Sequence, residues 1–132
     1  MFNKYVIKRK SENISKLFKD YKPNQEAAIV STGSALVLNI SSSSVDYIFV
    51  DPPFGANIMY SEGSFLWEAW LKVFTNNKTE AIENKSQNKS LNSYSNLMAL
   101  SFSEFFRVLK AGKWMTVEFS NTSASVWNGI QT

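Results

Sequence analysis

The stretch that decides the fold is YIFVDPPFGANIMY, which occupies residues 47–60. With the two residues before it, its first part reads VDYIFV, a β-branched and aromatic run that predicts a strand at residues 45–50. A continuous apolar run of this kind suits a parallel strand that is buried on both faces. An acid, two prolines and an aromatic residue follow directly at positions 51–54. A buried strand therefore leads straight into a stiff turn that carries one carboxylate.

Helices and strands alternate along the rest of the chain. The segments that we predict are a helix at residues 11–21, a strand at residues 27–30, helices at residues 64–74, 93–110 and 124–132, and a strand at residues 113–119. Residues 35–40 are ambiguous between a strand and a short helical turn. This order predicts an α/β architecture in which crossovers connect the strands of a parallel sheet.

Three of these segments carry further expectations. The helix at residues 64–74 is apolar nearly all round, so it should be buried, and Trp67 and Trp70 favour the core over a site. Residues 75–92 are polar and rich in Asn and Lys, which indicates a mobile loop. In the next helix six apolar residues share one face, and Gly112 can end that helix in the left-handed conformation. The six residues are Tyr94, Leu97, Met98, Phe102, Phe105 and Leu109.

The composition excludes several kinds of chemistry. The 132 residues contain no cysteine and no histidine, so we expect no disulfide, thiolate metal site, imidazole base or Ser-His triad, and no metal. No run of about 18 apolar residues predicts a membrane span, and no signal peptide is recognised, so we expect a cytoplasmic protein. Residues 1–22 carry seven Lys or Arg against two acids. We interpret this segment as a solvated basic helix, with contact to nucleic-acid phosphates as the alternative.

The turn at residues 51–54 offers a pair of hydrogen-bond acceptors at the carboxyl end of a strand, where open α/β sheets bind ligands. Because proline has no N–H and a fixed φ, the turn is stiff and the Pro52 carbonyl is free to point at a ligand beside the Asp51 carboxylate. Two adjacent acceptors match an exocyclic NH2 group, which carries two donors. Phe54 offers a face on which a planar base could stack, worth about 1–3 kcal/mol. The alternative is a tight turn with a capping Asp51 and a core Phe54.

The apolar strand before the motif and GANIMY after it favour the ligand-binding interpretation, and three segments carry a family resemblance. SVDYIFVDPPFGANIMYSE resembles motif IV of the DNA amino-methyltransferases, which methylate N6 of adenine or N4 of cytosine. STGSALVLNISSSSVDYIFVDPPF resembles the segment around and before that motif, and FRVLKAGKWMTVEF resembles the family's LKPGG turn and next strand. We therefore expect a basic N-terminal segment and helix at residues 1–25 and a partial methyltransferase domain at residues 26–132.

The resemblance implies a partial Rossmann-like class I fold that depends on S-adenosylmethionine and has a mostly parallel sheet. It implies a site-specific DNA methyltransferase of the kind found in restriction–modification systems, with DNA as the partner. In this assignment Asp51 and the Pro52 carbonyl accept the target amine, Pro53 completes the rigid turn, and Phe54 stacks on a flipped base. These catalytic residues position the amine, while the cofactor supplies the electrophile.

The resemblance also implies further site residues. Ser34, Asp51 and Pro53 would line the cofactor site. The candidates for binding the substrate are Phe54, Gly55, Asn57, Tyr60, Glu118 and Asn121. For Asn57 the favoured alternative is an Asx-turn, and Tyr60 suits a plain loop position equally well.

The sequence departs from the family at several points. The five glycines are never two residues apart, so the Phe-x-Gly-x-Gly cofactor loop is absent from these 132 residues, as are two core strands. Ser34 stands where the family often has Asp, Ala111 replaces the Pro of the KPG turn, and Ser120 replaces a His. We therefore expect about half of a domain, which is inactive alone. The alternatives are a split-enzyme subunit, a homo-oligomer or a non-catalytic remnant that acts as an interaction module, or an amino-methyltransferase of RNA or protein, where Asn usually replaces Asp51.

Overall fold

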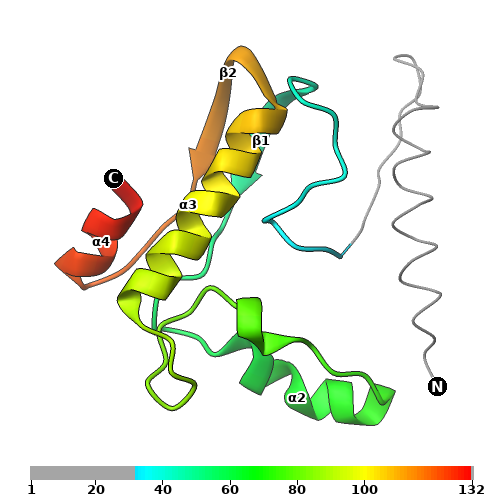
Figure 1. Cartoon of the computed structure of the whole chain (residues 1–132), viewed down its shortest axis with the longest axis vertical. Coiled ribbons are helices and arrows are strands. Elements are labelled where there is room, and N and C mark those ends of the chain that lie inside the picture. Colours follow the sequence, from blue (N-terminus) through cyan, green and yellow to red (C-terminus); the bar gives the residue numbers. More distant parts are fainter. Residues whose placement is uncertain (1–31, 132) are drawn as a thin grey trace.

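A computed structural model of the chain describes residues 32–131, which form a mixed α/β structure (Figure 1). The predicted helix at residues 11–21, the strand at residues 27–30 and the basic segment at residues 1–25 lie outside the described residues. The elements are β1 (Val45–Val50), α2 (Tyr60–Leu71), the 3₁₀ helix η1 (Asn77–Thr79), α3 (Leu91–Val108), β2 (Leu109–Val117) and α4 (Ala124–Gln131). The α/β class is therefore confirmed.

The two strands pair in parallel and form a two-stranded sheet. Tyr47 lies opposite Trp114, and Val50 lies opposite Val117. The chain passes from β1 to β2 through α2, η1 and α3, so the carboxyl ends of both strands meet at one edge of the sheet. The turn after β1 and the segment between β2 and α4 are thereby brought side by side.

The glycine after α3 adopts the predicted left-handed conformation, but not as a helix cap. α3 ends at Val108, and Leu109, which was expected on the helix face, already begins β2. Gly112 has a φ of 72° and lies within β2. The pairing with β1 is irregular between Val45 and Tyr47, because Val45 pairs with Leu109 whereas Tyr47 pairs with Trp114. Gly112 therefore takes its left-handed conformation in an irregular stretch of the strand, and its assignment as the helix cap is wrong.

The main core cluster lies between α3 and α4. Tyr94 and Met98 on α3 are buried against Val126 on α4, which confirms the predicted apolar face of this helix. Partly buried hydrophobic residues surround them: Ala81, Leu91, Phe102, Phe119 and Ile130. Burial of each large side chain contributes about 1.5–3 kcal/mol, so this cluster holds α4 against α3.

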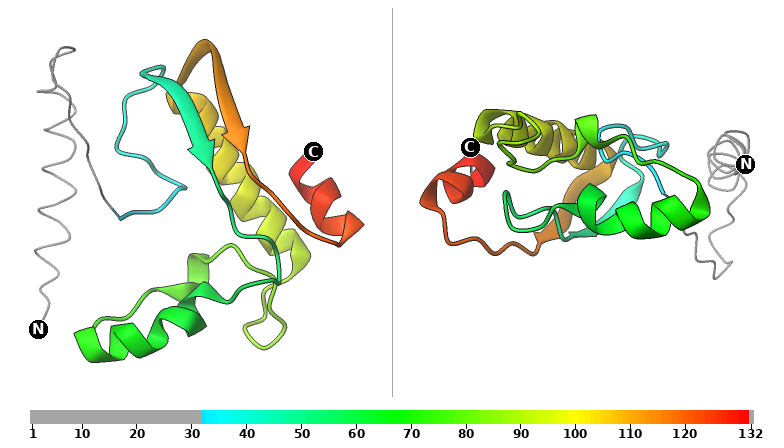
Figure 2. Two further views of the ribbon diagram at one scale, coloured as in Figure 1. Left: turned by 180° about the vertical axis from the view of Figure 1, so that it is seen from behind. Right: turned by 90° about the horizontal axis from the view of Figure 1, so that it is seen from below.

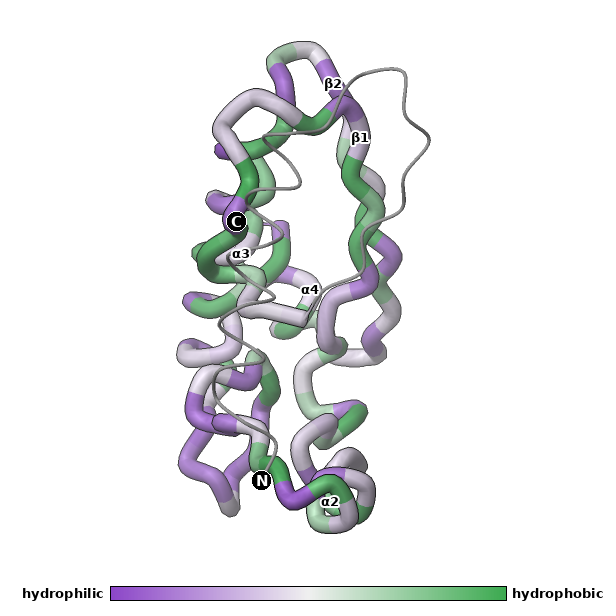
Figure 3. Tube along the Cα trace, turned by 90° about the vertical axis from the view of Figure 1, so that its right-hand side faces the viewer, coloured by the Kyte–Doolittle hydropathy of each residue, from purple (hydrophilic) through white to green (hydrophobic). Residues whose placement is uncertain are grey.

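Only one face of the sheet is covered within the described residues. α3 lies on that side (Figure 2), where Ile48 and Val50 are half-buried. Tyr47 and Phe49 alternate to the other face and are exposed, although β1 is a strongly hydrophobic stretch (Figure 3). The expectation that the strand is buried on both faces is therefore wrong for residues 32–131, because a helical layer packs on one face alone.

Helix α2 is also less buried than its sequence predicts. Although its sequence is apolar nearly all round, it contains no buried residue. Trp67 and Trp70, which were expected in the core, are both largely exposed. None of the described helices is long and apolar enough to cross a membrane. The apolar surface of α2 thus remains available to a partner.

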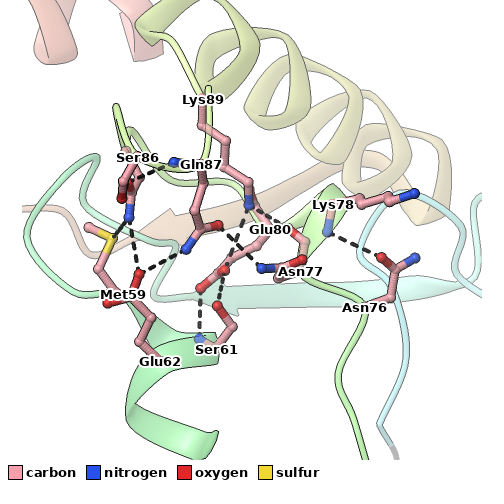
Figure 4. A network of polar contacts seen from close by, with 11 residues as sticks. Met59, Ser61, Glu62, Asn76, Asn77, Lys78, Glu80, Ser86, Gln87 and Lys89 are labelled. Atoms are coloured by element: carbon pink, nitrogen blue, oxygen red, sulfur yellow. Dashed lines mark hydrogen bonds and ion pairs between the residues drawn. The ribbon is translucent and has the colours of Figure 1, made fainter.

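Residues 75–92, where we expected a mobile loop, contain the 3₁₀ helix η1, a bridge between Asn84 and Lys89, and the start of α3. The Glu80 carboxylate accepts hydrogen bonds from the Ser61 amide at 2.9 Å and from the Ser61 hydroxyl at 2.6 Å, and so caps the start of α2 from outside the helix (Figure 4). Lys89 donates to the backbone carbonyl of Glu80 at 3.0 Å, and Ile82 is buried. Polar side chains of this segment thus bond one another and α2, while its mobility stays a prediction.

A pair of charged residues on α3 fixes the segment before β1, which forms turns rather than a strand. The Leu38 amide donates to Glu104 at 2.7 Å, and Arg107 donates to the Leu38 carbonyl at 3.0 Å and to Glu104 at 2.6 Å. Hydrogen bonds from Arg107 and from the Leu38 amide lower the pKa of Glu104 to about 2. The ambiguity at residues 35–40 is thus resolved in favour of the turn.

We expect this Glu104 contact to stabilise the fold above the ordinary Glu pKa of about 4.3 and to be lost as pH falls towards about 2. The sign follows because the pKa is lower in the folded state, so protonation favours unfolding. Glu104→Gln should lower the melting temperature at neutral pH, and its difference from the unchanged chain should shrink in acid. Glu118→Gln, at an exposed side chain, is the control. An equal difference at pH 7 and pH 2.5 would contradict the assignment.

Candidate functional site

The turn after β1 lies at the edge where both strands end. The Glu118 amide at the end of β2 donates to the Val50 carbonyl at 2.9 Å, so the sheet pairing continues up to the turn. Asp51 is exposed, and both Pro52 and Pro53 are half-buried. The end of β1 thus places the Asp51 carboxylate at the surface.

Three donors from three different segments hold the second half of this turn. The Tyr94 hydroxyl on α3 donates to the Pro53 carbonyl at 2.7 Å. The Asn121 side-chain amide donates to the Phe54 carbonyl at 2.8 Å, and the Glu83 backbone amide donates to the Gly55 carbonyl at 3.2 Å. Three successive carbonyls are therefore bonded from outside the turn. We call this arrangement the carbonyl clamp.

Gly55 is required where the clamp closes. It is buried and has a φ of 68°, which favours glycine. A Cβ at this position would lie 3.4 Å from the Asn121 side-chain nitrogen and 3.4 Å from Val126. These distances are ordinary van der Waals contacts, so the positive φ, and not lack of space, is what favours glycine here.

The clamp leaves two acceptors outside it. Within residues 32–131, neither the Asp51 carboxylate nor the Pro52 carbonyl accepts a hydrogen bond. Both residues line the same pocket, which has a volume of about 300 Å³. The turn thus presents acceptors at two successive residues, Asp51 and Pro52, and both remain able to accept hydrogen bonds from a ligand.

The clamp residue on α3 is fully buried, and burial raises the pKa of the Tyr94 hydroxyl, while a hydrogen bond with the Gly55 backbone opposes the shift. The hydroxyl therefore stays protonated through the neutral range and remains a donor to Pro53. The sequence indicated that Tyr94 belongs to the core. It gave no signal for the hydroxyl's contact, because its partner lies 41 positions earlier in the chain.

The pocket beside Asp51 brings together all three residues assigned to the cofactor site. Ser34, Asp51 and Pro53 line it together with apolar residues of α3, among them Phe102 and Phe105. Ser34 reaches this position because the segment before β1 is tied to α3 through Leu38. The residues that line this pocket are mostly apolar and include a few polar ones, as in small-molecule sites.

Phe54 belongs to a row of three aromatic rings. Its ring lies 5.1 Å from that of Phe119 at an interplanar angle of 78°, and Phe119 lies 5.0 Å from Trp127 at 85°. The Trp127 indole donates to the Asn121 carbonyl at 2.7 Å, which ties the row to the carbonyl clamp. Phe54 is half-buried, so its orientation is fixed while part of it remains accessible.

Besides Phe54, the residues assigned to substrate binding fall into two groups. Gly55 and Asn121 belong to the clamp, and both polar side-chain atoms of Asn121 are engaged, since its side-chain oxygen also accepts from the Ser123 amide at 2.7 Å. Asn57, Tyr60 and Glu118 are exposed and do not line the pocket beside Asp51. Their contact with substrate stays a prediction, whereas Asn121 gains a structural role.

No protein-family model, curated protein or solved structure matches the chain. Among the described residues, no group of three or more acidic side chains could hold a metal ion. The interpretation of the site therefore depends on its residues and geometry and on the resemblance of its motifs.

Removing the Tyr94 hydroxyl tests the clamp. Tyr94→Phe should lower the free energy of unfolding by about 0.5–1.5 kcal/mol, because the Pro53 carbonyl loses its donor while the ring still fills the core. Tyr47→Phe is the matched control, since it removes an exposed hydroxyl that donates to Thr116 at 2.6 Å. Urea unfolding measures both variants, and equal effects would argue against a special role for Tyr94.

Proposed function

We propose that this chain is part of a Rossmann-like, S-adenosylmethionine-dependent DNA methyltransferase that modifies the exocyclic amine of adenine (N6) or cytosine (N4). Three features support the proposal: the parallel strand pair with its helical crossover, the Asp-Pro-Pro-Phe turn at the strand end, and the pocket beside it. The ordered resemblance of three sequence segments points in the same direction.

The observation that carries the proposal is that the turn uses some of its acceptors for its own hydrogen bonds and leaves others for a ligand. The carbonyls of residues 53–55 hold the turn in place, while the Asp51 carboxylate and the Pro52 carbonyl remain as acceptors. An exocyclic amine has two N–H groups and would donate one to each acceptor. Such a pair of bonds orients the nitrogen lone pair away from the turn and towards an incoming electrophile. The turn thereby acts by positioning.

Adenine and cytosine are the DNA bases that suit this pair of acceptors and also expose an NH2 donor in the major groove. A base inside a duplex cannot reach a pocket, so it must be flipped out of the stack. Phe54, fixed by Phe119, would then stack on the flipped ring. Asp51 rather than Asn favours this DNA reaction over the related RNA or protein reactions, which remain the alternative.

S-adenosylmethionine fits the residues of this chain only in part. When bound, it would supply an electrophilic methyl group. The pocket lined by Ser34, Asp51 and Pro53 is at the lower end of the size range of about 300–1,000 Å³ typical of ligand sites. The glycine-rich loop that would hold the methionine end is absent from the 132 residues. We therefore assign no step through the cofactor to this chain alone, and a complementary segment must complete the site.

A second candidate is a non-catalytic interaction module or a split-enzyme subunit. The exposed face of the sheet and the exposed side chains of α2 favour it, since a parallel strand is normally covered on both sides. A split enzyme would reconcile the two candidates, because the partner would both cover the sheet and hold the cofactor.

The chain alone should transfer no methyl group to DNA. Incubation with tritiated S-adenosylmethionine and mixed-sequence duplex DNA should leave the DNA unlabelled, because the 132 residues lack the glycine-rich loop that would hold the methionine end of the cofactor. Label that enters DNA and disappears in Asp51→Ala would show that the chain is a complete enzyme.

When the missing half is supplied by fusion or from a full-length relative, Asp51→Ala should lower turnover by about 10- to 150-fold, which corresponds to the roughly 1.5–3 kcal/mol of one charged hydrogen bond. Cofactor affinity should hardly change, because the carboxylate meets the amine. Asp51→Asn keeps one acceptor and is the matched variant with an intermediate loss. Full turnover by Asp51→Ala on duplex DNA would overturn the assignment of the amine acceptor.

The aromatic residue of the turn can be tested in the same restored enzyme. Phe54→Tyr should have a mild effect, since the stacking face survives. Phe54→Ala should weaken retention of the flipped base by about 1–3 kcal/mol. Fluorescence of a duplex that carries 2-aminopurine at the target position reports the flipped base. An equal loss of cofactor binding in Phe54→Ala would instead indicate a structural role.

A further inference from the structure

The face of the sheet that α3 leaves uncovered is aromatic. Tyr47 and Phe49 of β1 lie next to Trp114 and Thr116 of β2 in register. The exposed fractions of Tyr47, Phe49 and Trp114 are 55%, 59% and 78%. We call these three side chains the sheet patch. Large exposed apolar patches on a folded chain mark interaction sites.

Helix α2 carries a second exposed apolar surface. Ser61, Glu62 and Glu68 face the segment that follows the helix, through hydrogen bonds to Glu80, Gln87 and Thr75. Residues 63, 66, 67 and 70 recur at helical spacing on the opposite side. Leu66, Trp67 and Trp70 there are exposed by 63%, 72% and 82%, and we call them the helix stripe. A Cβ at Gly63 would meet no atom within 4 Å, so the helix can approach another surface closely there.

The two surfaces are displaced along the strand direction. α2 lies beyond the carboxyl ends of the strands, and α3 covers one side of the sheet (Figure 2). The alternation of exposure along β1 assigns the sheet patch to the other side. A two-fold axis that runs between sheet and helix would therefore turn a second copy so that its helix lies on the first copy's sheet. The same operation places the first copy's helix on the second copy's sheet, which is an isologous arrangement.

We propose that a second copy of this chain covers the sheet patch, and that each copy lays its helix stripe across the sheet patch of the other. Helix packed on sheet is one of the stable ways in which secondary structure buries an apolar face. Each copy supplies one surface of each kind, so the dimer satisfies both surfaces with no further component. The proposal does not rest on the methyltransferase assignment, but it gives the sheet face to a second copy where the split-enzyme candidate gives it to a complementary half.

The available area matches what a stable dimer needs. The six side chains of the two surfaces are more than half exposed, and an aromatic side chain can bury about 150–250 Å². Together they offer on the order of 800 Å² per copy, which equals the contribution of each partner to a protein interface of standard size. Neither surface contains a charged residue, so no charge would be buried unpaired at its centre.

Disulfide cross-linking tests the arrangement, because the chain has no cysteine of its own. Trp70→Cys and Trp114→Cys are made in separate copies with different affinity tags, mixed and oxidised. The mixture should form cross-linked heterodimers about tenfold more than either variant alone, because the contact brings residue 70 of one copy to residue 114 of the other at high effective concentration. Phe106→Cys, on α3 at 82% exposure and outside both surfaces, is the matched control and should not cross-link with either.

Sedimentation velocity on the full chain provides the second readout. The unchanged chain of 15.0 kDa should sediment as a dimer. Trp70→Glu and Trp114→Glu should each sediment as a monomer with unchanged helical circular dichroism, and Phe106→Glu should remain a dimer. A monomer in the unchanged chain, a dimer that survives both glutamate variants, open-ended aggregation, or cross-linking that is equal in all pairs would overturn the proposal.

Discussion

The hydrogen bonds that hold the turn after β1 are the constraint on which the proposed site depends. Donors from α3, from the segment after η1 and from the segment before α4 bond the carbonyls of residues 53–55. Each donor is itself fixed: Tyr94 by the core, Asn121 by Ser123 and Trp127, and Glu83 by the ordered segment around Glu80. The two acceptors at positions 51 and 52 are positioned by contacts in which they do not take part.

This arrangement explains how the turn is held on a base of two strands within residues 32–131. The turn is connected to the α3–α4 cluster rather than to neighbouring strands, so it needs only β1 and β2 as a base. Within residues 32–131 the sheet has one covered face and two unpaired edges, and α2 buries none of its residues. The turn and these exposed surfaces therefore belong to different parts of the same structure.

Local sequence patterns predicted the helices and strands. They did not predict the contacts between residues that are far apart in the sequence. The run VDYIFV and the helical spacing of Tyr94 and Met98 were sufficient to find β1 and α3, because each pattern reflects a buried face. Composition indicated a mobile loop at residues 75–92 and could not show that Glu80 meets Ser61. The role of Asp51 and Pro52 as amine acceptors stays a prediction from the turn chemistry. The clamp was not predicted, since it joins positions 53 and 94, and 54 and 121.

The most direct test is a nuclear magnetic resonance titration of the chain with two pairs of nucleosides that have or lack the exocyclic amine. Adenosine and cytidine carry NH2 where inosine and uridine carry a carbonyl oxygen, and inosine and uridine also carry a proton on the adjacent ring nitrogen. We predict that adenosine or cytidine shifts the amide signals of Phe54 and Gly55, that Asp51→Ala abolishes the shift, and that inosine and uridine leave these signals unchanged. Equal shifts with all four nucleosides, or shifts that survive in Asp51→Ala, would contradict the claim that this turn recognises an exocyclic amine.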